Sequence, residues 1–333
     1  MFQLLGICLA LAALLVINAG ASFIAALVWR ALAYRAQSWR ASTRARILFA
    51  LRTWPSAFAI LCVAVLLFPA YFVYEPRASS EIVTAKLALL ASLSMLGLAL
   101  AMRRCLASWW ATRQLIKDWL RHAEPVLIRN VPVPVYRLAH RFPVIAVVGA
   151  FRPKLFIASH VFDALNNAEL DAALSHEIGH LAARDNLKRT FVRLCSDALA
   201  IISAQRILDR AWAESAEAAA DEYVAQTRGA SSALDLAAAL IKIARMAPQG
   251  ATPLMPAGAF LIGENADGIA WRVRRLTQLA AVESGTEQSE SLTRQFASWC
   301  GFCAILTLAA FVIDSQLLIA MHNFIEHIVS ALQ

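Results

Sequence analysis

Residues 176–180 read HEIGH, and this short segment decides how the rest of the sequence is interpreted. Residues four apart lie on the same face of a helix, so His176 and His180 can bind one metal ion while Glu177 lies beside it. The preceding residues, 169–175, place acidic side chains near the start of a helix and apolar ones at helical spacing after them. The alternative is an ordinary amphipathic helix with surface or core histidines. The helical context favours the metal-binding interpretation.

A second acidic cluster lies further along the chain, in the alanine-rich segment 211–227. This segment predicts a helix, because alanine has the highest helix propensity. Glu217 and Asp221 fall on one face of that helix. Glu217 is therefore the predicted third metal ligand, and Asp221 is expected to orient a metal-binding histidine. Glu214 and Glu222 compete for the ligand role, and the remaining alternative is a solvated acidic face.

Two histidines and one glutamate are a typical ligand set for catalytic zinc. Zinc held by three protein ligands keeps a position for water, lowers the pKa of that water and polarises a carbonyl group. Glu177 would then act as the general base. The sequence predicts zinc-dependent peptide hydrolysis, with His176, His180 and Glu217 as zinc ligands and Glu177 as the catalytic residue.

Several segments resemble, in order and spacing, the integral-membrane metallopeptidases of the beta-lactam sensor-transducer (BlaR/MecR-like) type. The resemblance is carried by VIAVVGAFRPKLFI at 144–157, the Glu169-Leu170 pair, HEIGH at 176–180 and RDNL at 184–187. In that family, and in related membrane peptidases that process prenylated or misfolded proteins, the third zinc ligand is the glutamate of a Glu-x-x-x-Asp motif. That motif corresponds to Glu217 and Asp221. The resemblance also implies a gluzincin-like domain in which an edge strand binds the substrate backbone.

The chain departs from this family in two places. Ala220 stands where the family often has cysteine, a position that is not a ligand. The antibiotic receptors carry a large extracellular sensor domain after their last membrane helix, whereas this sequence ends shortly after one, so beta-lactam sensing is not expected. Asp185, in the family-like Asp-Asn pair, is predicted to support the site by fixing the end of the metal-binding helix or by binding a basic side chain.

Composition independently predicts a membrane protein. Hydrophobic residues make up 59% of the 333 residues and charged residues 16%, and the mean hydropathy is +0.57. Uncharged or nearly uncharged segments long enough to cross a bilayer predict four transmembrane helices at about 2–29, 54–74, 82–102 and 295–321. The first could instead be a signal peptide with a cleavage site near Ala19-Gly20-Ala21, but no basic residue precedes it and its apolar character continues to Trp29.

The distribution of arginines predicts the orientation. Six arginines and no acid lie in residues 30–52, whereas the turn between the second and third helices has one arginine and two acids. The positive-inside rule places the first loop, and with it residues 106–294, in the cytoplasm of a bacterial-type inner membrane. Both termini, including the tail 322–333, would be external. Topology and anionic lipid explain most of the net charge of +8, so no nucleic-acid partner is expected.

The predicted fold class is a mainly α integral membrane protein. Residues 1–105 hold three transmembrane helices, and 106–294 form a cytoplasmic gluzincin-like α+β zinc-peptidase domain. Strands at 144–148 and 154–157 form its small sheet. The expected substrate is a protein or peptide, by resemblance a transcriptional repressor or the enzyme itself. A quality-control or prenyl-protein peptidase and a non-catalytic signal transducer remain alternatives.

Overall fold

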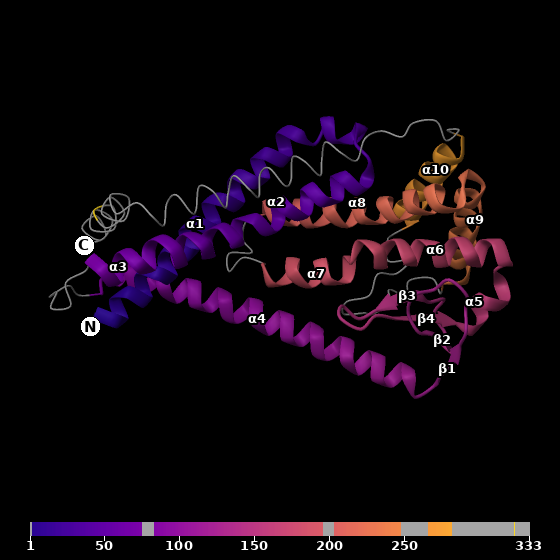
Figure 1. Ribbon diagram of the computed structural model, residues 1–333, viewed down its shortest axis with the longest axis horizontal. Coiled ribbons are helices and arrows are strands. Elements are labelled where there is room, and N and C mark those ends of the chain that lie inside the picture. Colours follow the sequence, from indigo (N-terminus) through magenta and orange to yellow (C-terminus); the bar gives the residue numbers. More distant parts are fainter. Residues whose placement is uncertain (1, 75–82, 196–202, 248–265, 282–322, 324–333) are drawn as a thin grey trace.

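The computed structural model describes residues 2–74, 83–195, 203–247, 266–281 and 323. Long apolar helices lie together at one end of the molecule, and shorter helices with a small sheet form the other end (Figure 1). The long helices are α1 (Phe2–Leu32), α2 (Ala41–Cys62), which continues through a π-helical turn (Val63–Leu67) into α3 (Phe68–Tyr74), and α4 (Ala85–Leu120). Phe2–Leu32, Ala41–Val73 and Ala85–Leu120 are long and apolar enough to cross a membrane. The first three predicted membrane helices are thereby confirmed as candidates, while the fourth, 295–321, and the tail, apart from residue 323, lie outside the described residues.

Two of these helices are longer than the sequence predicts. The second begins at Ala41 instead of residue 54, and the third continues to Leu120 instead of ending at residue 102. Arginine, lysine, leucine and alanine all have high helix propensity, so the helical backbone does not end where the apolar composition ends. Each helix therefore has a polar extension beyond its apolar part, and these extensions connect the membrane helices to the rest of the protein.

The extension of α2 runs antiparallel to helix α8 (Ser203–Arg228). Arg52 Nε lies 2.6 Å from Asp209 Oδ1, and Arg44 Nε donates to Ser215 Oγ at 2.9 Å. The Ala41 backbone N–H donates to the Glu222 carboxylate. Apolar side chains fill the space between these polar contacts: Trp29, Leu48, Leu208 and Trp212. Helix α8 is thus attached along much of its length to a candidate membrane helix.

The extension of α4 leads into a four-stranded sheet with the order β1-β2-β4-β3. The strands are β1 (Ala123–Val126), β2 (Val135–Leu138), β3 (Ile145–Val148) and β4 (Lys154–Ala158). Strands β2 and β4 are parallel and the other pairs are antiparallel. The two predicted strands are confirmed as β3 and β4, and the turn between them uses Gly149 at φ +104°. Trp119, near the end of α4, packs edge-on against Phe156 with ring centroids 5.0 Å apart.

Helix α6 (Asn167–Ala183) contacts β3 of the sheet on one side and α8 and α9 (Ala230–Met246) on the other. Its start is set by a capping box, in which Asn166 and Glu169 each accept a hydrogen bond from the other's backbone N–H. Glu169 also lies 2.7 Å from Lys242 on α9. The remaining helices are α5 (Ser159–Ala164), α7 (Asp185–Leu194) and α10 (Ala266–Ala281). Figure 1 shows α6 and α8 side by side, with α7 continuing toward α4.

The pair formed by Arg52 and Asp209 gives a direct test of the attachment between α2 and α8. Arg52 is 3% exposed and also donates to the Cys195 carbonyl at 3.0 Å. We expect Arg52→Gln to destabilise the protein by about 1 to 3 kcal/mol, because hydrogen bonds to charged groups are lost in a buried setting. Thermal unfolding in mild detergent should then show a midpoint several degrees lower. Arg46→Gln is the matched control, since Arg46 is exposed on the same helix, and equal midpoints for both variants would contradict the assignment.

Candidate active site

Close packing of α6 against α8 creates the site. A Cβ atom built on Gly179 would come within 3.3 Å of the Ala220 Cα and of the Tyr223 side chain, so glycine at this position lets the two helix backbones approach. The approach brings the Glu217 carboxylate next to His176 and His180. One ligand atom from each of these three residues lies within 4.8 Å of the others, and all three are buried.

Each of the two histidines is oriented by its own aspartate. His176 Nδ1 lies 3.0 Å from Asp221 Oδ1, and His180 Nδ1 lies 2.8 Å from Asp185 Oδ2. Each Nε2 is 3.5 Å from a Glu217 oxygen. Because Nδ1–H donates to a carboxylate, Nε2 is the nitrogen whose lone pair is left for a metal.

Asp185 reaches His180 because of a local change in the backbone. Arg184 has φ 55° and ends α6 in the left-handed conformation, so Asp185 starts a new helix and faces back toward the metal-binding helix. Lys188 lies 3.5 Å from the other Asp185 oxygen. The structure thus places Asp185 against both a histidine and a basic side chain.

Two arginines flank the Glu217 carboxylate. Arg189 Nη2 is 3.4 Å from Oε1, and Arg272 Nη1 is 3.3 Å from Oε2. Burial opposes ionisation of Glu217, but the charge of His180, the hydrogen bonds from both histidines and the charge of Arg272 outweigh burial and hold its pKa well below the usual range. Glu217 is therefore a charged carboxylate, as a metal ligand must be.

The charge of Glu217 in turn affects His180. Burial alone would lower the pKa of His180, but Glu217 and Asp185 outweigh it and raise the pKa to about 10. A metal ion that binds His180 must displace a proton from it, since only the neutral imidazole is a ligand. Asp221, buried beside Arg272, has its pKa lowered to about 2 despite its burial.

Glu177 is fully buried beside the two histidines. Its Oε2 accepts a hydrogen bond from the Val147 backbone N–H on β3 at 3.0 Å. Burial raises the pKa of Glu177 above its ordinary value, although both histidines and the Val147 N–H oppose the shift. A carboxylate with a raised pKa and one anchored oxygen is suited to accepting a proton.

Arg272 is a site residue that sequence reasoning missed. It lies on α10 and is 2% exposed. Its Nη2 is 2.6 Å from Asp221 Oδ1 and 3.4 Å from both ring nitrogens of His176. A signal was present in the sequence, because Arg272 falls on the apolar face made by Ile269, Val273 and Leu276 at helical spacing. A charged residue on such a face indicates a buried partner.

A cleft of about 380 Å³ leads to His180 between the β3–β4 turn and the start of α7. Val147, Phe151 and Asn186 are among the residues that line it. The Asn186 side-chain amide donates to the Val147 and Gly149 carbonyls at 2.9 and 3.2 Å. Strand β3 is at the edge of the sheet, but Glu177 and Asn186 already bind the polar groups of Val147. A substrate strand added there would share or replace those contacts.

The two other acids of α8 that could have been the third metal ligand make their contacts outside the site. Glu214 is exposed and pairs with Arg210 at 3.0 Å. Glu222 pairs with Arg275 and accepts from the Ala41 N–H, in the contact between α8 and α2. Ala220, where the family often has cysteine, is buried against α6. Of the acids on α8, Glu217 is therefore the one that lies with both histidines among the described residues.

The arrangement fits a catalytic zinc ion. His180 Nε2, Glu217 Oε2 and Glu177 Oε1 are buried and have no hydrogen-bond partner within the described part of the chain. Buried polar atoms without partners are costly, and a cation between the two histidines and Glu217 would satisfy His180 Nε2 and Glu217 Oε2. Two oriented imidazoles and one ionised carboxylate are also the donor set that catalytic zinc takes.

Comparison with known families agrees with this geometry. Residues 144–251 match Peptidase family M48. The matched segment includes β3, HEIGH on α6, and both Glu217 and Asp221 on α8. The match supports a metallopeptidase family, which is a broader statement than the BlaR/MecR-like resemblance. A search of curated proteins found no match.

Loss of one ligand should be visible in the metal content. We expect the purified wild-type protein to hold one zinc per chain and His180→Ala to lose most of it, because Glu217 and His176 alone cannot close the site. His122→Ala is the matched control, since His122 is exposed at the end of α4. Metal analysis of the purified proteins measures this. Full zinc occupancy in His180→Ala would refute the ligand assignment.

Proposed function

We propose that this protein is a membrane-embedded zinc-dependent endopeptidase that cleaves protein substrates on the cytoplasmic side. One observation carries the proposal: the ligand atoms of His176, His180 and Glu217 converge in a buried site beside Glu177. The match of this segment to Peptidase family M48 supports the peptidase activity.

His176, His180 and Glu217 would hold the metal. When bound, zinc would polarise the scissile carbonyl and lower the pKa of a water molecule. Asp221 and Asp185 hold the two imidazoles in the tautomer that leaves Nε2 free. Arg189 and Arg272 pair with the Glu217 carboxylate and hold it in place.

Glu177 performs the proton transfer in this proposal. The Val147 N–H fixes Oε2, which leaves Oε1 to accept the proton of the attacking water. The protonated carboxyl can then donate that proton to the departing amine, so the same residue acts as base and acid. Its raised pKa makes this carboxylate a stronger base than an ordinary glutamate, which favours the first of these steps.

The position of the site favours substrates held at the membrane surface. Glu217 lies between Ser215 and Glu222, whose contacts with α2 are at Arg44 and Ala41. The apolar part of α2 starts about nine residues after Arg44, which is about 14 Å along a helix. A membrane-attached substrate is concentrated near such a site. This supports cleavage of the enzyme itself or of membrane proteins under quality control over cleavage of a freely diffusing repressor.

The alternative of a non-catalytic signal transducer is disfavoured by Glu177. A buried carboxylate with one oxygen that lacks a partner in the described residues destabilises the fold. A purely structural domain has no reason to keep it, whereas a hydrolase needs it.

Glu177→Gln should separate the base from the ligands. We expect this variant to fold and to keep its zinc, while peptide hydrolysis falls by about 100- to 10,000-fold, because the amide cannot accept the proton. Cleavage of a fluorescent casein substrate in detergent, together with metal analysis, measures both properties. Glu214→Gln, an exposed acid on α8, is the control and should behave as wild type. Loss of zinc from Glu177→Gln would mean that Glu177 helps to hold the metal, which contradicts its assignment as the general base.

Reporter fusions test the orientation. We expect reporters joined after Arg40 and after Met246 to give a cytoplasmic signal, and one joined after Tyr74 to give an external signal, because arginines concentrate in the first loop. Fluorescent and alkaline phosphatase reporters at the same positions give opposite readouts. An external signal after Met246 would place the site on the other side of the membrane.

A further inference from the structure

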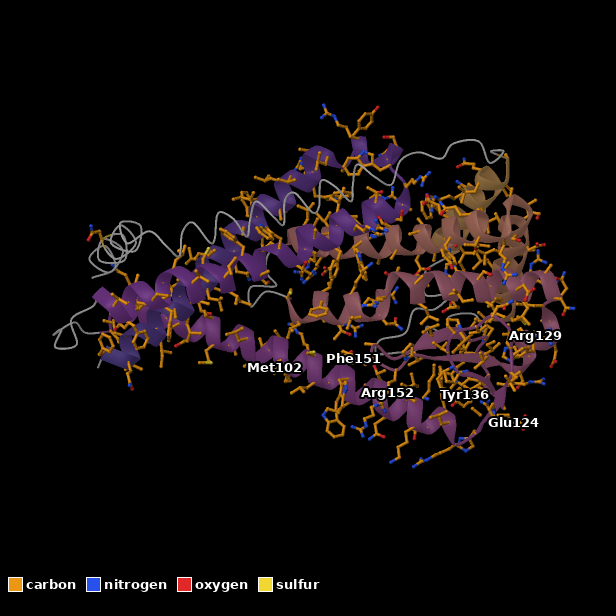
Figure 2. All side chains as sticks on the ribbon, viewed as in Figure 1. Met102, Glu124, Arg129, Tyr136, Phe151 and Arg152 are labelled. Atoms are coloured by element: carbon orange, nitrogen blue, oxygen red, sulfur yellow. The ribbon has the colours of Figure 1, made fainter. Side chains whose placement is uncertain are left out.

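A second cleft lies between α4, the β3–β4 turn and α7, on the side of the turn that faces α4. Its volume is about 470 Å³. Figure 2 shows Phe151 and Arg152, at the tip of the turn, beside α4. The cleft is mostly apolar, yet three arginines from three different elements line it: Arg113, Arg152 and Arg193. None of its described lining residues is acidic.

The level of this cleft along α4 is that of the membrane surface. The 20 residues from Ala85 to Arg104 span about 30 Å, the thickness of the hydrocarbon core. Residues 105–113, several of which line the cleft, occupy the next turns of the helix, where lipid headgroups and water meet. Trp109 and Trp110 are exposed there, as is typical of side chains at a membrane interface.

The three arginines have no acidic partner among the described residues. Arg193 is partly buried and donates to Ser108 on α4. Burial lowers the pKa of Arg193 and the neighbouring Arg189 lowers it further, while Cys105 opposes the shift. Arg113 lies over the Trp109 ring, with its guanidinium carbon 5.2 Å from the ring centroid. An anion in the cleft would satisfy all three cations.

The apolar wall of the cleft identifies the rest of the ligand. Phe151 is 79% exposed to solvent at the tip of the turn, which is unfavourable for a phenylalanine in water. At the membrane surface the same side chain can pack against acyl chains. A ligand with a phosphate group and an apolar tail fits both the arginines and this wall.

We propose that the cleft binds an anionic phospholipid of the surrounding leaflet, with its phosphate among Arg113, Arg152 and Arg193 and its upper acyl chain against Trp109 and Phe151. This cleft is separate from the cleft that leads to His180, but both lie against the β3–β4 turn, since Gly149, Ala150 and Phe151 line both. The bound lipid would hold the β3–β4 turn, and through it the strand whose Val147 N–H anchors Glu177. This inference does not depend on the proposed peptidase activity.

Lipid binding to the full-length protein in mild detergent tests the proposal. The probes are dioleoyl phosphatidylglycerol and dioleoyl phosphatidylcholine, which share acyl chains and differ in headgroup charge, and native mass spectrometry counts the bound lipids. We expect saturable binding of phosphatidylglycerol, at least tenfold tighter than binding of phosphatidylcholine. In Arg113→Gln/Arg152→Gln this binding should be about 30-fold weaker. Both substituted residues are exposed, so the fold should be retained, and thermal unfolding checks this.

Arg129→Gln is the matched control, because Arg129 is exposed at the far side of the sheet from this cleft (Figure 2). It should bind phosphatidylglycerol as wild type does. Quenching of tryptophan fluorescence by brominated phosphatidylglycerol gives a second readout, which Trp109→Phe should reduce. Equal affinity for the two lipids, or equal loss in the double variant and the control, would overturn the proposal. So would an acidic peptide that binds through Arg113 and Arg152 and displaces phosphatidylglycerol, because the cleft would then be a peptide site.

Discussion

The close approach of α6 and α8 is the constraint on which the site depends. Two histidines on one helix can present their nitrogens to one point, but the third donor must come from another helix. Gly179 and Ala220 remove the side-chain volume that would hold these helices apart. The HEIGH segment therefore determines packing as well as chemistry, because its glycine sets how closely α8, which carries Glu217, approaches the two histidines.

The second requirement is a balance of buried charge. Four carboxylates surround the two histidines, and two arginines from different helices face them. The aspartates fix the histidine tautomers, while the histidines and Arg272 keep Glu217 and Asp221 ionised in a setting where burial would favour their protonated forms. Arg272 makes α10 part of the site, although α10 is distant in sequence from HEIGH.

Much of this arrangement could be predicted from the sequence. Helical spacing placed His176 and His180 on one face with Glu177 beside the metal position, and the alanine-rich segment placed Glu217 and Asp221 together on another helix. The spacing did not indicate which aspartate serves which histidine, because that depends on the left-handed turn at Arg184 and on the position of α8. Strands β1 and β2 were missed since they are short and contain polar residues, including Glu124 and Arg137.

The lengths of the membrane helices could not be read from hydropathy, since a helix continues as long as its residues favour helical backbone. The resulting extension of α2 holds α8 at Asp209, Ser215 and Glu222, on both sides of the residue that completes the ligand set. Helix α2 contains Pro55 and continues into a π-helical turn, features at which helices bend. The candidate metal site is consequently joined to a helix whose other end is apolar enough to cross a membrane. In the proposed membrane arrangement, a change in bilayer thickness that alters the tilt of α2 would therefore also shift α8, and with it Glu217, relative to the two histidines.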